Sequence, residues 1–195
     1  VSATPFEFER QMQYLKKTFN IINCQQLVDY ITKDIPLPPR SAMVTFDDGY
    51  FDNYSQAYPI LRELNIPAVI FLATDYIGTN QPFYWDYIAY CFSHTKLNHA
   101  HLSVVGERTW SNENEKNIVL HEWIETLKKI QEKEKQIAIN SIATALSVSV
   151  PEDAFKGLHL NWQQVREMHK NGIEFGAHTA SHPILTRIPL HQAQD

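Results

Sequence analysis

The chain has 195 residues, of which 44% are hydrophobic and 20% are charged, values typical of a single soluble globular domain. A formal net charge of -5 without any run of Lys and Arg argues against nucleic acid as a partner. Two cysteines are too few for a Cys-rich metal site, and no stretch is apolar enough for a transmembrane segment. We expect a soluble segment, either cytoplasmic or exported with its signal peptide removed, and the composition leaves its oligomeric state open.

The chain opens with two predicted helices and a strand. Apolar residues recur at helical spacing over residues 5–19 and again over 24–33. The proline-rich segment that follows is incompatible with a helix interior. The apolar run 41–46 then predicts a buried strand, which ends at Asp47 and Asp48.

Alternating helices and strands follow. We expect a helix over residues 53–64, a buried strand over 68–72, a helix over 162–170 and a strand over 172–177. Asn161 is a plausible N-cap for the third of these elements. Strand, helix and strand in this order imply right-handed parallel βαβ connections.

A long stretch, about residues 84–157, interrupts this alternation. It contains a polar short-strand region near 102–110 and a helical region over 112–146. We interpret it as an insertion packed against the side of the core, and a separate binding subdomain is the alternative. The apolar residues expected to pack its helices are Val119, Trp123, Leu127, Ile130, Ile137 and Ile142.

Two carboxylates stand where the first predicted strand ends. Parallel strands gather catalytic groups at their carboxyl ends. Adjacent strand residues point to opposite faces, so Asp47 and Asp48 reach one site only if the strand geometry breaks there, and Gly49 permits a sharp turn. A polar Asp-Gly turn without function is the alternative interpretation.

Two histidines follow the last predicted strand. His178 and His182 are four residues apart, so on a single helical turn, ended by Pro183, their imidazoles would share one face. A chance pair is the alternative in a chain with nine histidines. Together, one Asp and these two His form a three-ligand set that leaves positions open for water and substrate, as in catalytic zinc sites. The second carboxylate is then free to act as a base.

Both segments resemble known signature motifs. The sequences TFDDGY at residues 45–50 and GAHTASHP at 176–183 are similar to the first two motifs of the polysaccharide deacetylase family, carbohydrate esterase family 4. The resemblance extends over about 41–185, apart from the insertion. It implies an α/β fold: a distorted, incomplete (β/α) barrel in a single domain over residues 1–195, with the helical insertion at about 84–157.

The resemblance also implies a reaction and roles for individual residues. Asp47 would be the catalytic base, and Asp48, His178 and His182 would hold one divalent ion, which we expect to be Zn²⁺. Water would attack the amide carbonyl, so that N-acetyl or O-acetyl groups leave a polysaccharide or glycan substrate. Tyr50 and the later Trp85 are candidates for binding the glycan, with simple packing as the alternative for both.

The chain departs from the family in one respect. The resemblance implies three later motifs, namely an Arg-x-Pro segment, an acidic segment and a Leu-x-His general acid, and none occurs in these 195 residues. We therefore expect either a C-terminally truncated domain or a degenerate member. The alternative function is a glycan-binding protein that keeps the metal site without turnover. We expect residues 1–195 alone to keep the ligand set and to hydrolyse substrate poorly.

Overall fold

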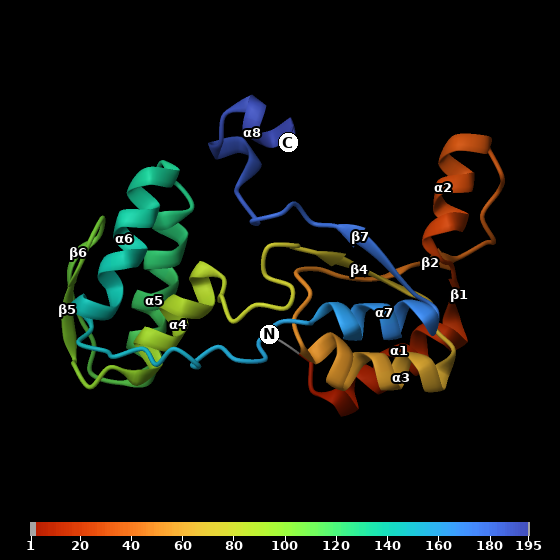
Figure 1. Cartoon of the computed structure of the whole chain (residues 1–195). Coiled ribbons are helices and arrows are strands. Elements are labelled where there is room, and N and C mark those ends of the chain that lie inside the picture. The colour runs from red at the N-terminus through yellow and green to blue at the C-terminus, as the bar shows by residue number, and fades with distance from the viewer. Residues whose placement is uncertain (1–2, 195) are drawn as a thin grey trace. The chain divides into compact units, whose positions relative to one another are not determined.

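The computed structural model describes residues 3–194 and shows a mixed α/β fold (Figure 1). These residues form two compact units. Unit 1 comprises the chain up to residue 80 together with 156–182, and unit 2 comprises 81–155 together with the chain from 183 onward. The predicted catalytic and metal-binding residues all lie in unit 1.

Unit 1 contains both opening helices and every parallel strand. Its elements are α1 (Pro5–Thr18), β1 (Asn20–Ile21), α2 (Cys24–Lys33), β2 (Ser41–Ala42), β3 (Val44–Phe46), the π-helical turn η1 (Asn53–Ala57), α3 (Tyr58–Leu64), β4 (Ala68–Leu72), α7 (Trp162–Lys170) and β7 (Ile173–Ala177). The predicted helix over 53–64 therefore begins with a π-helical turn and becomes an α-helix only at Tyr58.

The main sheet is parallel and has the order β3-β4-β7. Ala68 of β4 is in register with Val44 on one side and with Ile173 on the other. Strands β4 and β7 end together, at Leu72 and Ala177, and β3 ends at Phe46, opposite Ile70. All three strands therefore deliver the segments that follow them to the same edge of the sheet. A second parallel pair joins β1 to β2. None of the sheets in the described part of the chain is closed, which agrees with the predicted incomplete barrel.

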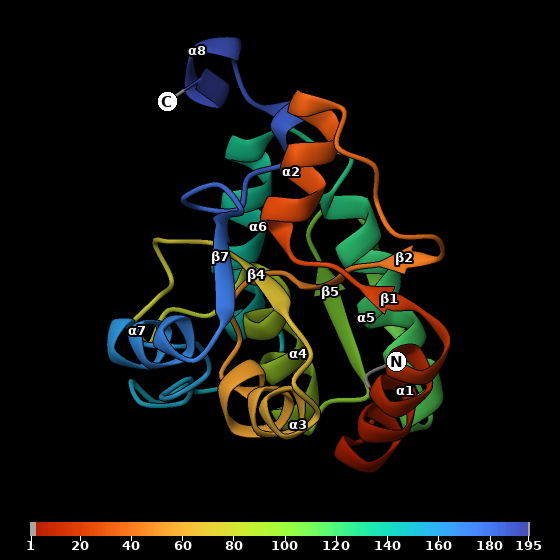
Figure 2. The same cartoon turned by 90° about the vertical axis from the view of Figure 1, so that its right-hand side faces the viewer.

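Three helices cover one side of this sheet. Figures 1 and 2 both show α1, α3 and α7 on the same side of β4 and β7. The fully or largely buried side chains of this core are Met12, Val44, Ala57, Tyr58, Leu61, Ile66, Ala68, Ile70, Leu72, Ile77, Leu160, Val165, Met168 and Ile173. Most of them come from alternate positions of the strands and from one face of each helix, and Ile66, Ile77 and Leu160 come from the connecting segments.

Helix α7 begins where the sequence predicts it. The side chain of Asn161 accepts a hydrogen bond from the backbone N–H of Gln164, and the Gln164 side chain accepts one from the backbone N–H of Asn161. This capping box satisfies two N–H groups that a helix start leaves without partners. Such an N-cap contributes about 1 kcal/mol. It fixes the point where the chain enters α7 from residues 158–160, which contact the candidate site.

Unit 2 is mainly helical. It contains α4 (Tyr84–His94), the antiparallel strands β5 (His99–Leu102) and β6 (Gly106–Thr109), α5 (Glu113–Leu127), α6 (Glu132–Ala145), the 3-10 turn η2 (Leu185–Arg187) and α8 (Leu190–Gln194). Helices α5 and α6 both pack on α4. Within the described residues, no helix combines the length and apolar character needed to cross a membrane.

Unit 2 has a hydrophobic core of its own. Val119, Trp123 and Leu127 of α5 are buried there, as predicted, and so is Ile142 of α6. The prediction for Ile137 is wrong, because this side chain is 62% exposed. The buried face of α6 follows the helical spacing Lys135, Ala138, Ile139 and Ile142, and a residue two positions before Ile139 points away from that face.

Candidate metal site

The two aspartates lie directly beyond the end of β3. The strand stops at Phe46, and Asp48 and Gly49 adopt left-handed backbone conformations with φ of 73° and 82°. Strand alternation is therefore broken at Asp48, which is the condition that the sequence analysis set for Asp47 and Asp48 to reach one site. The Asp48 side chain is half-buried, whereas Asp47 is exposed.

The two histidines lie in a loop. Residues 178–182 are not helical, so the predicted single helical turn is wrong. Thr179 and His182 instead have φ of 62° and 54°, and the Thr179 hydroxyl accepts a hydrogen bond of 3.0 Å from the backbone N–H of His182. This side chain-to-backbone turn brings the imidazoles together without a helix. The Nε2 atoms of His178 and His182 are 3.1 Å apart.

Asp48 completes a cluster of three potential ligand atoms. Its Oδ1 lies 3.2 Å from Nε2 of His182 and 3.6 Å from Nε2 of His178. Three ligand atoms bound tetrahedrally at roughly 2.0–2.2 Å from one ion would be about 3.3–3.6 Å apart. These three residues could therefore hold a metal ion with little movement.

The chemistry of the cluster also suits a cation. Oδ1 of Asp48 is buried, and no hydrogen bond to it is found within residues 3–194. A buried carboxylate oxygen without such a bond is costly unless a charge compensates it. Burial raises the pKa of Asp48. The charges of His182 and then of His178 lower this pKa, and the charge of Asp47 raises it further. A dication at the cluster would favour the ionised carboxylate and neutral imidazoles, and so would compensate the cost of burying the Asp48 carboxylate.

Backbone hydrogen bonds hold the histidine loop to the segment after β4. The N–H of His178 donates to the carbonyl of Leu72 at 2.9 Å, which extends the sheet register by one residue. The N–H of Asp75 then donates to the carbonyl of Ala180 at 3.0 Å, and the N–H of Thr74 donates to Thr179 at 3.3 Å. The loop thus rests on the carboxyl end of β4.

A second segment supports the aspartate loop. The N–H of Leu160 donates to the carbonyl of Gly49 at 2.9 Å, and the N–H of Phe51 donates to Leu158 at 2.9 Å. Sequence analysis missed both supporting segments, 73–76 and 158–160. Their contacts run largely through backbone atoms, which leave no signature in side-chain patterns.

The two predicted glycan-binding aromatics lie in different units. Tyr50, in unit 1, stands two residues after Asp48, and its ring centroid is 5.3 Å from that of His159. Trp85, on α4 of unit 2, is stacked on Phe83 with ring centroids 4.5 Å apart and an interplanar angle of 12°. Substrate binding by Tyr50 and Trp85 stays a prediction.

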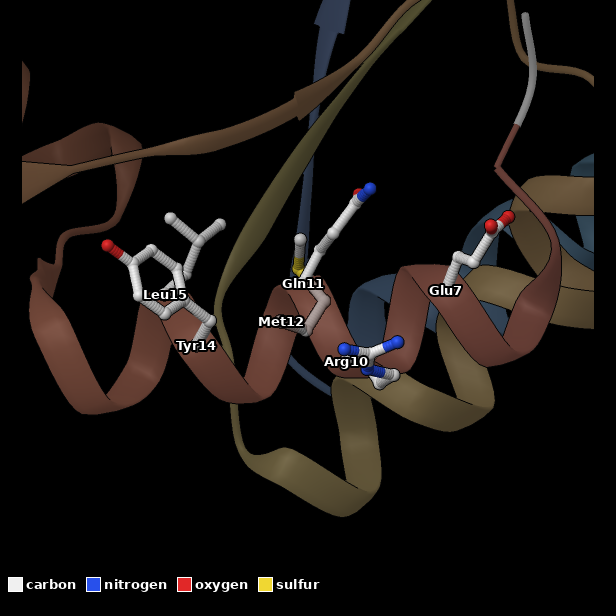
Figure 3. Close-up of a pocket in the computed structure, with 6 residues that line it drawn as sticks. All are labelled: Glu7, Arg10, Gln11, Met12, Tyr14 and Leu15. Atoms are coloured by element: carbon white, nitrogen blue, oxygen red, sulfur yellow. The ribbon is translucent and has the colours of Figure 1, made fainter.

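A surface hollow on α1 has no link to this cluster. It has a volume of about 620 Å³ and is lined by Glu7, Arg10, Gln11, Met12, Tyr14 and Leu15. Figure 3 shows Glu7, Gln11 and Leu15 projecting from one side of the helix, as expected for residues four positions apart. The Glu7 carboxylate accepts the backbone N–H of Thr4 in the capping box that begins α1.

Known proteins resemble this chain in fold and in sequence. The Streptococcus pyogenes deacetylase PplD, solved in complex with acetate, superposes with a TM-score of 0.51 at 16% identity, over 96% of this chain and 52% of that chain. The poly-beta-1,6-N-acetyl-D-glucosamine N-deacetylase of Staphylococcus epidermidis is 35% identical over 79 residues, which are 40% of this chain and 27% of that protein. A Staphylococcus aureus protein of the same name is 33% identical over 78 residues, with the same coverage.

The matches to curated relatives cover a small share of those proteins, whereas the family profile covers most of this chain. Matches to curated relatives span 26% to 27% of the length of those proteins. The sequence profile of the family described as polysaccharide deacetylase, in contrast, matches residues 34–195, which include both predicted motifs. With most of its length matched and a deacetylase-like fold, the chain belongs to the polysaccharide deacetylase family.

Proposed function

We propose that this protein is a metal-dependent hydrolase that removes N-acetyl or O-acetyl groups from a polysaccharide. The observation that carries the proposal is the convergence of Asp48, His178 and His182 on a point where a buried carboxylate oxygen lacks a hydrogen bond. Membership of the polysaccharide deacetylase family supports the reaction class. The names of the staphylococcal relatives support a poly-N-acetylglucosamine as one substrate to test.

The proposed metal set consists of two imidazoles and one carboxylate. Such a set suits a Zn²⁺-like ion better than Ca²⁺ or Mg²⁺, whose ligands are mainly oxygen atoms. When bound, the ion would polarise the acyl carbonyl and acidify water. Asp48, His178 and His182 would hold the ion and leave its remaining coordination positions to water and substrate.

Asp47 is the proposed general base. Its carboxylate is exposed, so water and substrate can reach it, and it is adjacent in sequence to the proposed ligand Asp48. It would accept a proton as water attacks the acyl carbon. A C–O bond forms, the C–N bond of the N-acetyl group breaks, and the departing nitrogen takes up the proton that water gave to Asp47, so the products are acetate and a free amine on the sugar.

Acetate release from defined glycans tests this proposal. The protein should be expressed from its own complete gene, loaded with Zn²⁺ and given chito-oligosaccharides and poly-β-1,6-N-acetylglucosamine. We expect acetate from at least one substrate, and loss of turnover without loss of metal in Asp47→Asn. Metal-loaded protein that leaves a broad panel of acylated glycans unchanged would contradict the proposal. Glycan binding without any acetate release would instead support the non-catalytic alternative.

A further inference from the structure

His159 is a buried histidine between two tyrosine rings. Its side chain is only 5% exposed. The ring centroid lies 5.3 Å from that of Tyr50 and 5.5 Å from that of Tyr76, with interplanar angles of 30° and 52°. His159 also forms an antiparallel β-bridge with Tyr50. These contacts lie entirely within unit 1.

Each tyrosine belongs to a segment that contacts a proposed metal ligand. Tyr50 stands two residues after Asp48, in the loop that follows β3. The Tyr76 hydroxyl donates a long hydrogen bond of 3.4 Å to the carbonyl of Ser181, the residue before His182. His159 therefore sits in the middle of a chain of contacts that joins the aspartate loop to the histidine loop.

Both loops have backbone conformations that need support. Asp48, Thr179 and His182 are non-glycine residues with φ of 73°, 62° and 54°. L-residues adopt this left-handed region infrequently, and they remain there when surrounding contacts hold them. The side chain of His159 contacts Tyr50 of the aspartate loop and Tyr76, whose hydroxyl bonds to the histidine loop, whereas the hydrogen bonds of Leu160 and Asp75 each hold one loop separately.

We propose that His159 is a positioning residue that sets the separation between Asp48 and the pair His178 and His182. The proposal rests on the metal site of the proposed function. The planar ring of His159, packed between Tyr50 and Tyr76, keeps the carboxylate and imidazoles close enough for one ion. Its removal would let the two loops drift apart. Residues that hydrogen-bond to metal ligands typically affect metal affinity by about 10- to 100-fold, and we take the same range for His159, which acts on the ligands through the two tyrosines.

Metal titration of His159 variants tests the proposal independently of activity. Dissociation constants for Zn²⁺ would be measured by competition with a chelator, and the visible spectrum of bound Co²⁺ would report the coordination geometry. We expect His159→Ala to bind Zn²⁺ about 10- to 100-fold more weakly and to change the Co²⁺ spectrum. We expect His159→Phe to restore most of the affinity, because it keeps a planar ring between the tyrosines.

A matched control separates positioning from general stability. Met168 is fully buried on α7, so Met168→Ala should lower the melting temperature without changing Zn²⁺ affinity or the Co²⁺ spectrum. If His159→Ala does not fold, Tyr76→Phe removes only the hydroxyl that reaches Ser181 and should weaken Zn²⁺ binding by a few-fold.

The possible failures are distinguishable. Wild-type protein that binds no transition metal would overturn the proposed function itself. Wild-type protein that binds Zn²⁺ while His159→Ala has the same affinity and spectrum would overturn only the role of His159. Equal losses in His159→Phe and His159→Ala would also overturn it, because ring packing would then not be the cause. If His159→Ala does not fold and only Tyr76→Phe can be measured, an unchanged affinity for Zn²⁺ would contradict the proposal.

Discussion

The Nε2 atom of His182 lies 3.2 Å from Oδ1 of Asp48, and this contact joins the loops after β3 and β7, two strands that are not neighbours. Strand β4 lies between them in the sheet. The two loops must therefore meet across the carboxyl end of β4, where the segment after Leu72 supports the histidine loop. The arrangement makes the proposed metal site a link between strands at opposite edges of the sheet.

Metal binding should stabilise the folded protein. The folded state brings Asp48, His178 and His182 together, and an ion at 100 times its dissociation constant adds about 2.7 kcal/mol to the free energy of unfolding. Zn²⁺ should raise the melting temperature of the wild type, and a chelator should reverse the increase. Stoichiometric metal by elemental analysis in the double variant His178→Ala, His182→Ala would contradict the assignment of the ligands.

The variant Asp47→Asn should separate metal binding from turnover. It removes the proposed base and leaves the three ligands intact, so kcat should fall by roughly 10²- to 10⁴-fold while Zn²⁺ still raises the melting temperature. Asp52→Asn is a matched control, because it removes the same charge from another exposed carboxylate nearby in the sequence. If Asp47→Asn keeps its kcat, measured by acetate release, a residue other than Asp47 acts as the base.

Regular elements were the part of the fold best predicted from sequence. The buried strand Ala68–Leu72 and the helix Trp162–Lys170 have the predicted bounds, because an apolar run and a capped amphipathic segment are local signals. The contact between Asp48 and His182 could be expected in outline, since parallel strands end at one edge. It could not be predicted in detail, because it depends on positive φ angles and on backbone hydrogen bonds from distant segments.

The histidine loop shows why local spacing was misleading. Two histidines four residues apart suggest a helical turn. Thr179 and His182 instead adopt left-handed conformations and form a different turn, which also brings the two imidazoles together. Pairing with Leu72 and contacts from Asp75 select this conformation. Long-range contacts of this kind are invisible in a pattern read along a single segment.

A side chain at Gly49 should destabilise the fold. A Cβ at this position would lie 2.8 Å from both Ile77 Cδ1 and Leu72 Cδ2, and φ is +82°. Gly49→Ala should lower the free energy of unfolding by about 2–4 kcal/mol, through backbone strain of order 1 kcal/mol and the clash. Gly157→Ala is the control, because φ is similar at +74° but no atom lies within 4 Å. Equal losses in urea denaturation would show that the clash is relieved.

Cys91 should be an unreactive thiol. Its side chain is fully buried in the core of unit 2, and burial raises the pKa of the thiol from its usual value of 9.0 to about 11. Thiolate is the reactive form, so a thiol reagent at pH 8 should label half-buried Cys24 and spare Cys91. The variant Cys24→Ala isolates the signal of Cys91. Rapid labelling of Cys91 in this folded variant would contradict its burial.

The same burial predicts a loss of stability at high pH. Between pH 9 and pH 11 the unfolded Cys91 thiol ionises while the folded one keeps its proton. The unfolded state then binds fewer protons than the folded state, so the free energy of unfolding decreases as pH rises; below pH 9 this contribution is fully present. Two pH units correspond to a loss on the order of 2–3 kcal/mol.

Cys91→Ala lowers the starting stability through a cavity but removes this pH-dependent component. Denaturant titrations of wild type and variant at several pH values should therefore converge between pH 9 and pH 11, and parallel curves would show that the thiol titrates alike in both states.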